Sequence, residues 1–402
     1  MEVRAQIDDR AVYMAGETIS CTVVLKNPNA GPESGPKNLA WLSAQIHCQC
    51  QFDDALLRAP PNNGTREESS DLLKQRPHLQ TTSFVPTKGE TGMCSMSTEA
   101  IVLACDVRLE PGEKKTYVYT DVVPFDSPPS YRGHMVMYSY KLTVGAQRIN
   151  GLTKMLKIPF RVLCIPEHAL LPRAVALANP YSCQEEDVDS VTLAFHRIMS
   201  IASQRSARTL SVACHRGTVV RCLPMKDSYR LGEEVSFTLD FSTGTVVCQQ
   251  VSVTVQCEEN IPQECWANHA RIQPAVKSYS KRHNFCLHTK RLHFNLPIPL
   301  TATPSFTTDL VIFSWKLHFE FLLCVKSASM TSMPVQRATR SHTPTRALPP
   351  SSPLRMPDEL RLGNSDTPTE TLSWDFPINV LPSHPSHVAV LAGRPPSQSV
   401  IL

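Results

Sequence analysis

Cysteine and histidine are the residues of this sequence with the greatest capacity for chemistry. The chain of 402 residues contains 14 cysteines and 14 histidines. A zinc site of the usual kind needs two closely spaced pairs of ligands, whereas the nearest pair here is Cys48-Gln-Cys50 and no second pair of that type follows. We therefore interpret the cysteines mainly as reduced, buried thiols. A metal site and disulfides are the alternatives, and we predict no metal.

Adjacent Cys and His residues could act as a catalytic dyad only if their side chains met. His47 precedes Cys48, and Cys214 precedes His215, in segments that alternate like strands, so the members of each pair point to opposite faces. Only 15 glycines are present, and no phosphate-binding loop, Gly-x-Ser-x-Gly elbow or His-Glu-x-x-His pair occurs. We predict no catalytic residue and no cofactor, and hence a protein that is not itself an enzyme.

Charge and hydropathy restrict the partners of the chain. The 40 Lys and Arg residues against 36 Asp and Glu give a net charge of +4 without a run of five basic residues, which makes nucleic acid an unfavoured partner. Met1–Arg10 is too charged for a secretion signal. The apolar segment Val311–Val325 is interrupted by charges and is shorter than the ~20 residues of a membrane-spanning helix. We expect a cytoplasmic protein whose membrane contacts are peripheral.

Three blocks of the first half of the sequence recur, in the same order, in the second half. The first block opens with Tyr-x-x-Gly-Glu before an alternating apolar strand pattern, and the second contains Pro-Ser-aromatic before Val-x-x-Ser-aromatic-Lys-Leu. The matched pairs are Tyr13–Leu25 with Tyr229–Phe241, Pro129–Leu142 with Pro304–Leu317, and Ile158–Leu163 with Phe376–Leu381. Such a repeat predicts one β-domain that was duplicated.

The spacing of the blocks locates an insertion in each copy. The first two blocks start 116 residues apart in the first copy but 75 in the second, while the start of the second block and the proline of the third block (Pro159 or Pro377) are 30 and 73 residues apart. We predict an all-β fold of two tandem immunoglobulin-like β-sandwich domains. The predicted boundaries are 1–165 with an insertion at 54–92, a linker at 166–208, 209–382 with an insertion at 327–370, and a flexible tail at 383–402.

The second insertion is basic. Between Ser327 and Pro357 it contains four arginines and no acidic residue, and we expect it to be disordered because few periodic apolar residues offset its ordering entropy. Our hypothesis is an electrostatic contact with anionic lipid or an acidic partner, weakened by phosphorylation at the two Ser/Thr-Pro sites. The candidate residues are Arg337, Arg340, Thr343, Arg346, Ser352 and Arg355.

The linker contains the one clear helical pattern, at about residues 187–204. Val191, Phe195, Ile198 and Ala202 follow at steps of four, three and four, which places them on one face of a helix. Two interpretations stay open. The helix is either a strut packed against a sandwich or a docking surface for a partner, and these four residues are the candidate docking side chains.

The repeated motifs resemble the arrestin superfamily, and longer stretches are similar to its Rgp family. The stretches that carry the second resemblance are Ala40–Gln49, Tyr131–Gly133, Tyr138–Asn150, Phe313–Phe319 and Leu372–Pro382. The resemblance implies two arrestin-like sandwiches and a non-catalytic subunit of the Ric–Rgp guanine-nucleotide exchange complex. The implied partners are a Ric-type β-propeller protein and a Golgi Rab GTPase of the Rab-six subfamily, in retrograde and intra-Golgi vesicle transport at the Golgi membrane.

A second function stays open, that of an arrestin-like cargo adaptor for the cytosolic tails of membrane proteins. The sequence Pro128-Pro129-Ser130-Tyr131 also matches the Pro-Pro-x-Tyr ligand of WW domains. Its last three residues, however, belong to the repeat, whose second copy has Pro304-Ser305-Phe306. We therefore expect Tyr131 to be an apolar plug in the fold.

Overall fold

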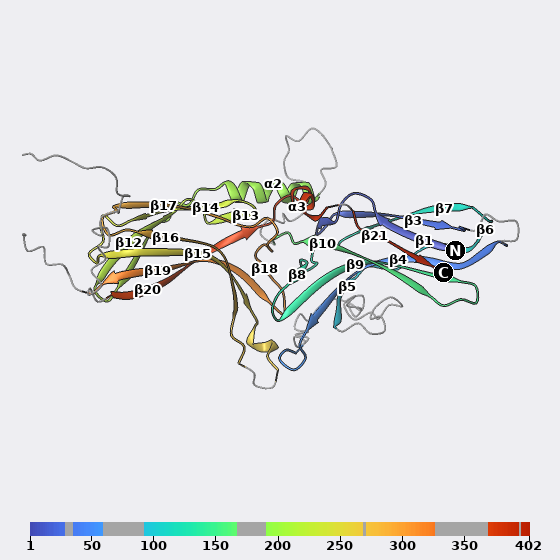
Figure 1. The fold of residues 1–402 in the computed structure, drawn as a ribbon, viewed down its shortest axis with the longest axis horizontal. Helices are drawn as coiled ribbons and strands as arrows, with labels where there is room; N and C mark the ends of the chain where they lie inside the picture. Colours follow the sequence, from blue (N-terminus) through green and yellow to red (C-terminus); the bar gives the residue numbers. More distant parts are fainter. Residues whose placement is uncertain (29–34, 59–91, 167–189, 268–270, 326–368, 394) are drawn as a thin grey trace, which may run out of the picture.

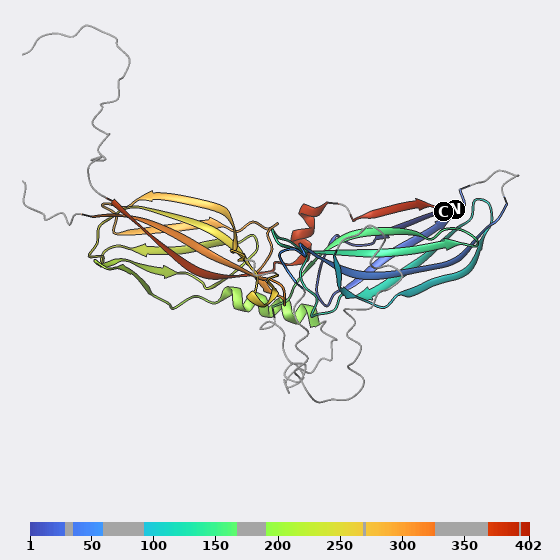
Figure 2. The same cartoon turned by 90° about the horizontal axis from the view of Figure 1, so that it is seen from below.

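The structure is a computed structural model that describes residues 1–28, 35–58, 92–166, 190–267, 271–325, 369–393 and 395–402. Figure 1 and the turned view in Figure 2 show an elongated molecule in which two β-rich halves lie end to end. Strands dominate the described residues, so the all-β prediction is confirmed. No helix in these ranges is long and apolar enough to cross a membrane.

The first half consists of two sheets. One has the strand order β21-β1-β3-β7, and the other has the order β2-β10-β9-β4-β5, with β6 on β4 and β8 on β9. The strands are β1 (Glu2–Ile7), β2 (Val12–Met14), β3 (Thr18–Lys26), β4 (Lys37–Phe52), β5 (Met93–Ser97), β6 (Ile101–Leu109), β7 (Lys114–Val122), β8 (Tyr131–Arg132), β9 (Val136–Arg148), β10 (Lys154–Leu163) and β21 (Ser397–Ile401).

The second half repeats this plan after helix α2 (Ser190–Ser203). Its sheets have the orders β11-β12-β14-β17 and β13-β20-β19-β15-β16, with β18 on β19. The elements are β11 (Leu210–Cys214), β12 (Gly217–Pro224), β13 (Ser228–Arg230), β14 (Glu234–Asp240), β15 (Cys248–Asn260), η3 (Gln263–Cys265), β16 (Ala275–Phe285), β17 (Arg291–Pro297), β18 (Phe306–Thr307), β19 (Ile312–Cys324) and β20 (Thr369–Leu381).

Alternating apolar residues build the core between the sheets of each half. Strand β3 buries every second residue from Ile19 to Leu25, and β19 does the same from Phe313 to Leu323. Phe237 of β14 meets Phe319 of β19 edge to face at 5.1 Å between ring centroids, which joins the two sheets of the second half. The period of two in the sequence therefore decides which face of each strand is buried.

The strand pairing confirms the predicted repeat. Strand β2 pairs with β10 in parallel, with Tyr13 opposite Val162, and β13 pairs with β20 in parallel, with Tyr229 opposite Val380. The Pro-Ser-aromatic motifs also make equal contacts. The Ser130 hydroxyl accepts the N–H of Val162, as the Ser305 hydroxyl accepts that of Val380. The two copies thus share hydrogen bonds as well as residue types.

The prediction of a flexible tail at 383–402 is wrong. Helix α3 spans Pro385–Ala392, with His384 as its N-cap, and β21 pairs antiparallel with β1 so that Val400 lies opposite Val3. The backbone groups of β1 on that side need partners, and β21 supplies them. The two ends of the described chain therefore lie side by side, where the Leu402 N–H donates to the Met1 carbonyl at 2.8 Å (Figure 1).

The predicted insertions fall largely outside the described residues. Of 54–92, the structure describes the turn up to Arg58 and resumes at Gly92, and of 327–370 it describes only Thr369 and Glu370, which already belong to β20. The predicted linker helix is confirmed as α2, which the structure describes from Ser190 to Ser203, while residues 187–189 of the expected range lie outside the described residues.

Candidate functional site

Helix α2 carries the predicted docking residues, and the chain itself covers them. Val191, Ile198 and Ala202 are buried, and Phe195 is half-buried. Ala194, which is too small to have stood out in the sequence pattern, completes this face. The residues that pack against the face come from both halves and from α3, namely Val12, Met14, Leu163, Ile165, Leu381 and Val388. These contacts favour the strut interpretation, because a partner could reach this face only by displacing them.

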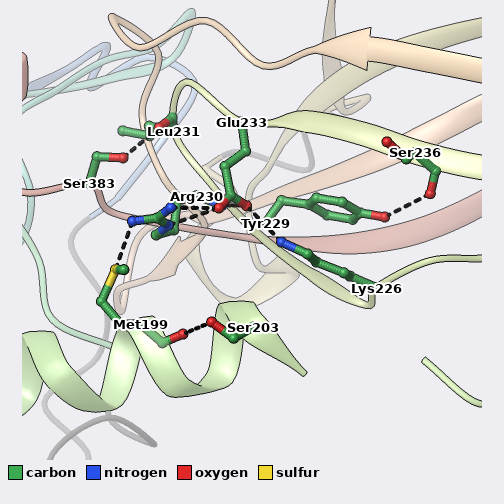
Figure 3. A network of polar contacts seen from close by, with 9 residues as sticks. All are labelled: Met199, Ser203, Lys226, Tyr229, Arg230, Leu231, Glu233, Ser236 and Ser383. Atoms are coloured by element: carbon green, nitrogen blue, oxygen red, sulfur yellow. Dashed lines mark hydrogen bonds and ion pairs between the residues drawn. The ribbon is translucent and has the colours of Figure 1, made fainter. Parts of the chain in front are cut away.

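The Tyr-x-x-Gly-Glu turn of the second half is tied to α2 by a polar network (Figure 3). The Arg230 guanidinium donates to the Glu233 carboxylate at 2.7 and 2.9 Å and to the Met199 sulfur of α2 at 2.7 Å. Burial favours the neutral form of Glu233, but the backbone N–H and guanidinium of Arg230 outweigh it and lower the pKa of Glu233 below its usual value. The carboxylate is therefore ionised at neutral pH and holds the turn.

The first half uses the same device at the same place. The Glu17 carboxylate accepts from the Arg10 guanidinium at 2.6 Å and from the Met14 N–H at 2.9 Å. Gly16 between them has φ +90°, and a Cβ there would lie 2.2 Å from the Phe125 ring, so glycine is required. The repeated Tyr-x-x-Gly-Glu motif is thus a turn that positions β2 and β13 beside helix α2.

The segment after β20 also belongs to the junction, the region where the facing ends of the two halves and helix α2 meet. The Ser383 hydroxyl donates to the Leu231 carbonyl of the second half. The His384 ring meets the Phe195 ring of α2 edge to face at 4.9 Å between centroids. Together with Val388, these contacts tie α3 to α2, although the sequence pattern had not indicated a second helix.

Aromatic residues of the repeated motif meet directly where the two halves touch. The Tyr131 ring lies 5.0 Å from the Phe306 ring and 5.0 Å from the Phe313 ring. Tyr131 and Phe306 occupy equivalent positions in the two copies, so each plugs the space beside the other. Tyr131 is buried, which confirms the prediction that it is an apolar plug in the fold. Because its side chain is not accessible, Pro128-Pro129-Ser130-Tyr131 is not available to a WW domain in this structure.

Glu259 at the end of β15 forms a polar link across the junction through three hydrogen bonds. Its buried carboxylate accepts the backbone N–H groups of His134, Met135 and Val136 in the first half at 2.6, 3.1 and 3.1 Å. Our sequence reasoning missed this residue. The alternation along β15 could have indicated it, because Glu259 continues the buried series Val253, Val255 and Cys257.

We expect Gly133→Ala to loosen the junction and to destabilise the protein by about 1–3 kcal/mol. A Cβ at Gly133 would lie 2.4 Å from a Tyr131 ring carbon and 2.5 Å from a Glu259 carboxylate oxygen, so both side chains would have to move. Chemical denaturation measures the change. Gly35→Ala is the control, since nothing lies within 4 Å of its added Cβ. Equal stability of the two variants would contradict the close packing at this junction.

Most thiols of the described residues are shielded from solvent. All thirteen cysteines in these ranges are free and nine are buried. Burial raises the pKa of Cys48, Cys50 and Cys164 to about 12, so these groups stay protonated and are poor nucleophiles or metal ligands at neutral pH. Within the same ranges no group of three or more His, Cys, Asp or Glu residues could hold a metal ion. The remaining candidates, from Arg337 to Arg355, lie outside the described residues.

Comparison with known proteins finds relatives that match the chain over nearly its whole length. Residues 38–209 and 218–324 match the Rgp1 family. A human protein named RAB6A-GEF complex partner protein 2 is 37% identical over 415 residues, which cover 100% of this chain and 99% of that protein. The Bos taurus protein of the same name is 36% identical over 398 residues, which cover 96% and 94%. Since the matched residues span both halves of the fold, the chain belongs to the Rgp1 family.

Proposed function

We propose that this chain is a non-catalytic subunit of a heteromeric guanine-nucleotide exchange factor for a Rab GTPase of the Rab-six subfamily. The observation that carries the proposal is the end-to-end similarity to proteins named as partners in a RAB6A-GEF complex. The proposal extends to a Ric-type β-propeller partner and to retrograde and intra-Golgi transport, with the complex associated peripherally with Golgi membranes from the cytoplasm.

The junction supports the role of a rigid scaffold. An exchange factor must bind the nucleotide-free GTPase more tightly than the loaded form, and that preference requires contacts aimed at the nucleotide site. Charged groups at the junction are instead engaged within the chain, as with Glu233 and Arg230 or Glu259 and three N–H groups. Such an arrangement fixes the angle between two halves and suits a subunit that holds partners in place.

We expect the purified chain alone to leave the rate of nucleotide release from a Rab-six GTPase unchanged, and its complex with the β-propeller partner to raise it at least about tenfold, a barrier change of about 1.4 kcal/mol. Release of a fluorescent nucleotide measures both rates, with a Rab of another subfamily as the control. Acceleration by the chain alone would refute the non-catalytic role. If a pulldown of the chain from cells recovered varied membrane cargo and no stoichiometric β-propeller protein, the adaptor function would be favoured.

A further inference from the structure

The far end of the second half exposes a group of apolar side chains. The register of β15, β16 and β19 places Glu259 and Phe313 at the junction and Cys248, Phe285 and Leu323 at the opposite end. Phe285 is 83% exposed and Leu287 is 48% exposed, and Val247 and Val325 beside them are also exposed. Backbone hydrogen bonds hold these turns together, from the Cys286 N–H to the Gln249 carbonyl and from the Cys324 N–H to the Val247 carbonyl.

The same end is basic. No acidic residue occurs between Lys281 and Arg291, the part of the chain that runs towards this end along β16 and returns into β17, and it contains Lys281, Arg282, Lys290 and Arg291. The acidic groups nearby are already engaged, since Asp240 pairs with Arg291 and Glu370 with Arg216. The side chains of Arg282 and Lys290 are exposed and make no ion pair with any residue that the structure describes.

Protection of a sheet edge accounts for only part of this pattern. Strand β16 is an edge strand, and lysines on an edge strand discourage pairing with another chain. A phenylalanine with most of its surface in water does not serve that purpose. The first copy has a polar turn at the equivalent position, Glu110-Pro-Gly-Glu113 between β6 and β7. The two copies of one fold therefore differ in the chemistry of this turn.

We propose that the far end of the second half docks on an anionic lipid bilayer. Phe285 and Leu287 would enter the headgroup region, where apolar area is removed from water. Arg282 and Lys290 would meet lipid phosphates and carboxylates, an attraction that the negative surface potential of a bilayer strengthens. The charge of this surface decides which kind of bilayer it prefers. Its exposed cations lack ion-pair partners among the described residues and the nearby carboxylates are already paired, so an anionic bilayer is favoured over a neutral one. This inference does not depend on the proposed exchange function.

Co-sedimentation of the full chain with vesicles tests the proposal, using phosphatidylcholine alone and phosphatidylcholine mixed with phosphatidylserine. We expect binding to the mixed vesicles only. Phe285→Ser with Leu287→Ser should weaken that binding by about tenfold or more through lost apolar burial. Arg282→Gln with Lys290→Gln should weaken it at least about fivefold and reduce its dependence on salt. The matched control is Leu152→Ser, which replaces a side chain that is also 83% exposed but lies in the turn between β9 and β10, at the opposite end of the molecule.

Three results would overturn the proposal: no binding of the wild-type chain to mixed vesicles, unchanged binding of the Phe285/Leu287 variant, or an equal loss in the Leu152 variant. All variants should melt like the wild type, because the altered side chains are exposed. In the complex, nucleotide exchange on a Rab without its lipid anchor, measured without vesicles, should match the wild type in every variant. A failure of wild-type exchange in that assay would count against the proposed function and leave the lipid contact standing.

Discussion

The Ile198→Asp variant is expected to lose about 4 kcal/mol or more of its free energy of unfolding, with a melting temperature lower by about 10 °C. Ile198 is fully buried at the centre of the α2 face, between side chains of both halves and of α3. A carboxylate there would have to be buried without a partner, or the helix would have to leave its site. Thermal melting of the purified chain, followed by circular dichroism, measures the effect.

Leu193→Asp is the matched control for this experiment, because it places the same charge on the exposed side of the same helix. It should change the stability by less than about 1 kcal/mol. Phe195→Asp should give an intermediate loss, since that ring is half-buried against His384. If Ile198→Asp melted like the wild type but no longer bound the β-propeller partner, α2 would be a docking helix and the strut interpretation would fail.

The Glu259→Ala variant is expected to lose about 3 kcal/mol and to free the two halves to move relative to each other. Removal of the carboxylate leaves the N–H groups of His134, Met135 and Val136 without their acceptor. The stability of Glu259→Gln should lie between that of the wild type and that of Glu259→Ala, because the amide oxygen of glutamine can still accept a hydrogen bond. Melting curves give the stability, and small-angle scattering gives the change in overall dimensions.

The neighbouring Glu258→Ala is the control for this second variant. Glu258 pairs with Lys316 at 2.8 Å on a partly exposed face of the same strand, where an ion pair contributes at most about 1 kcal/mol. If Glu259→Ala had the same stability and the same dimensions as Glu258→Ala, the Glu259 carboxylate would not hold the junction together.

Local patterns made much of this fold predictable. The repeated Tyr-x-x-Gly-Glu and Pro-Ser-aromatic blocks correspond to the same turns and strand pairs in both halves, and the steps of four, three and four define α2. An amphipathic pattern, however, indicates only that a face is covered and not what covers it. The coverage of α2 by Met14, Leu163 and Leu381 depends on contacts far apart in the sequence.

The segment after β20 shows the same limit. Helix α3 has only eight residues, too few for a periodic pattern to stand out, and β21 is a short polar strand whose partner β1 lies at the other end of the chain. The strand propensity of β21 is weak, so the sequence alone does not favour a strand there. The segment forms a strand because the open edge of β1 offers unpaired backbone groups to it. The site at Phe285 was missed because one strand residue among many gives no signal without its three-dimensional neighbours. Glu259 was missed although it continues the alternation of buried residues along β15.

The pairing of β21 with β1 has a consequence for biosynthesis. Strand β21 follows every other described strand in the chain, so it leaves the ribosome after all of them. Until then, the edge of β1 lacks its partner and can pair with other chains. The two halves are therefore not independent units during synthesis, and the first half can be completed only after the second has emerged. A chaperone that shields the β1 edge in the meantime would protect the nascent protein from aggregation.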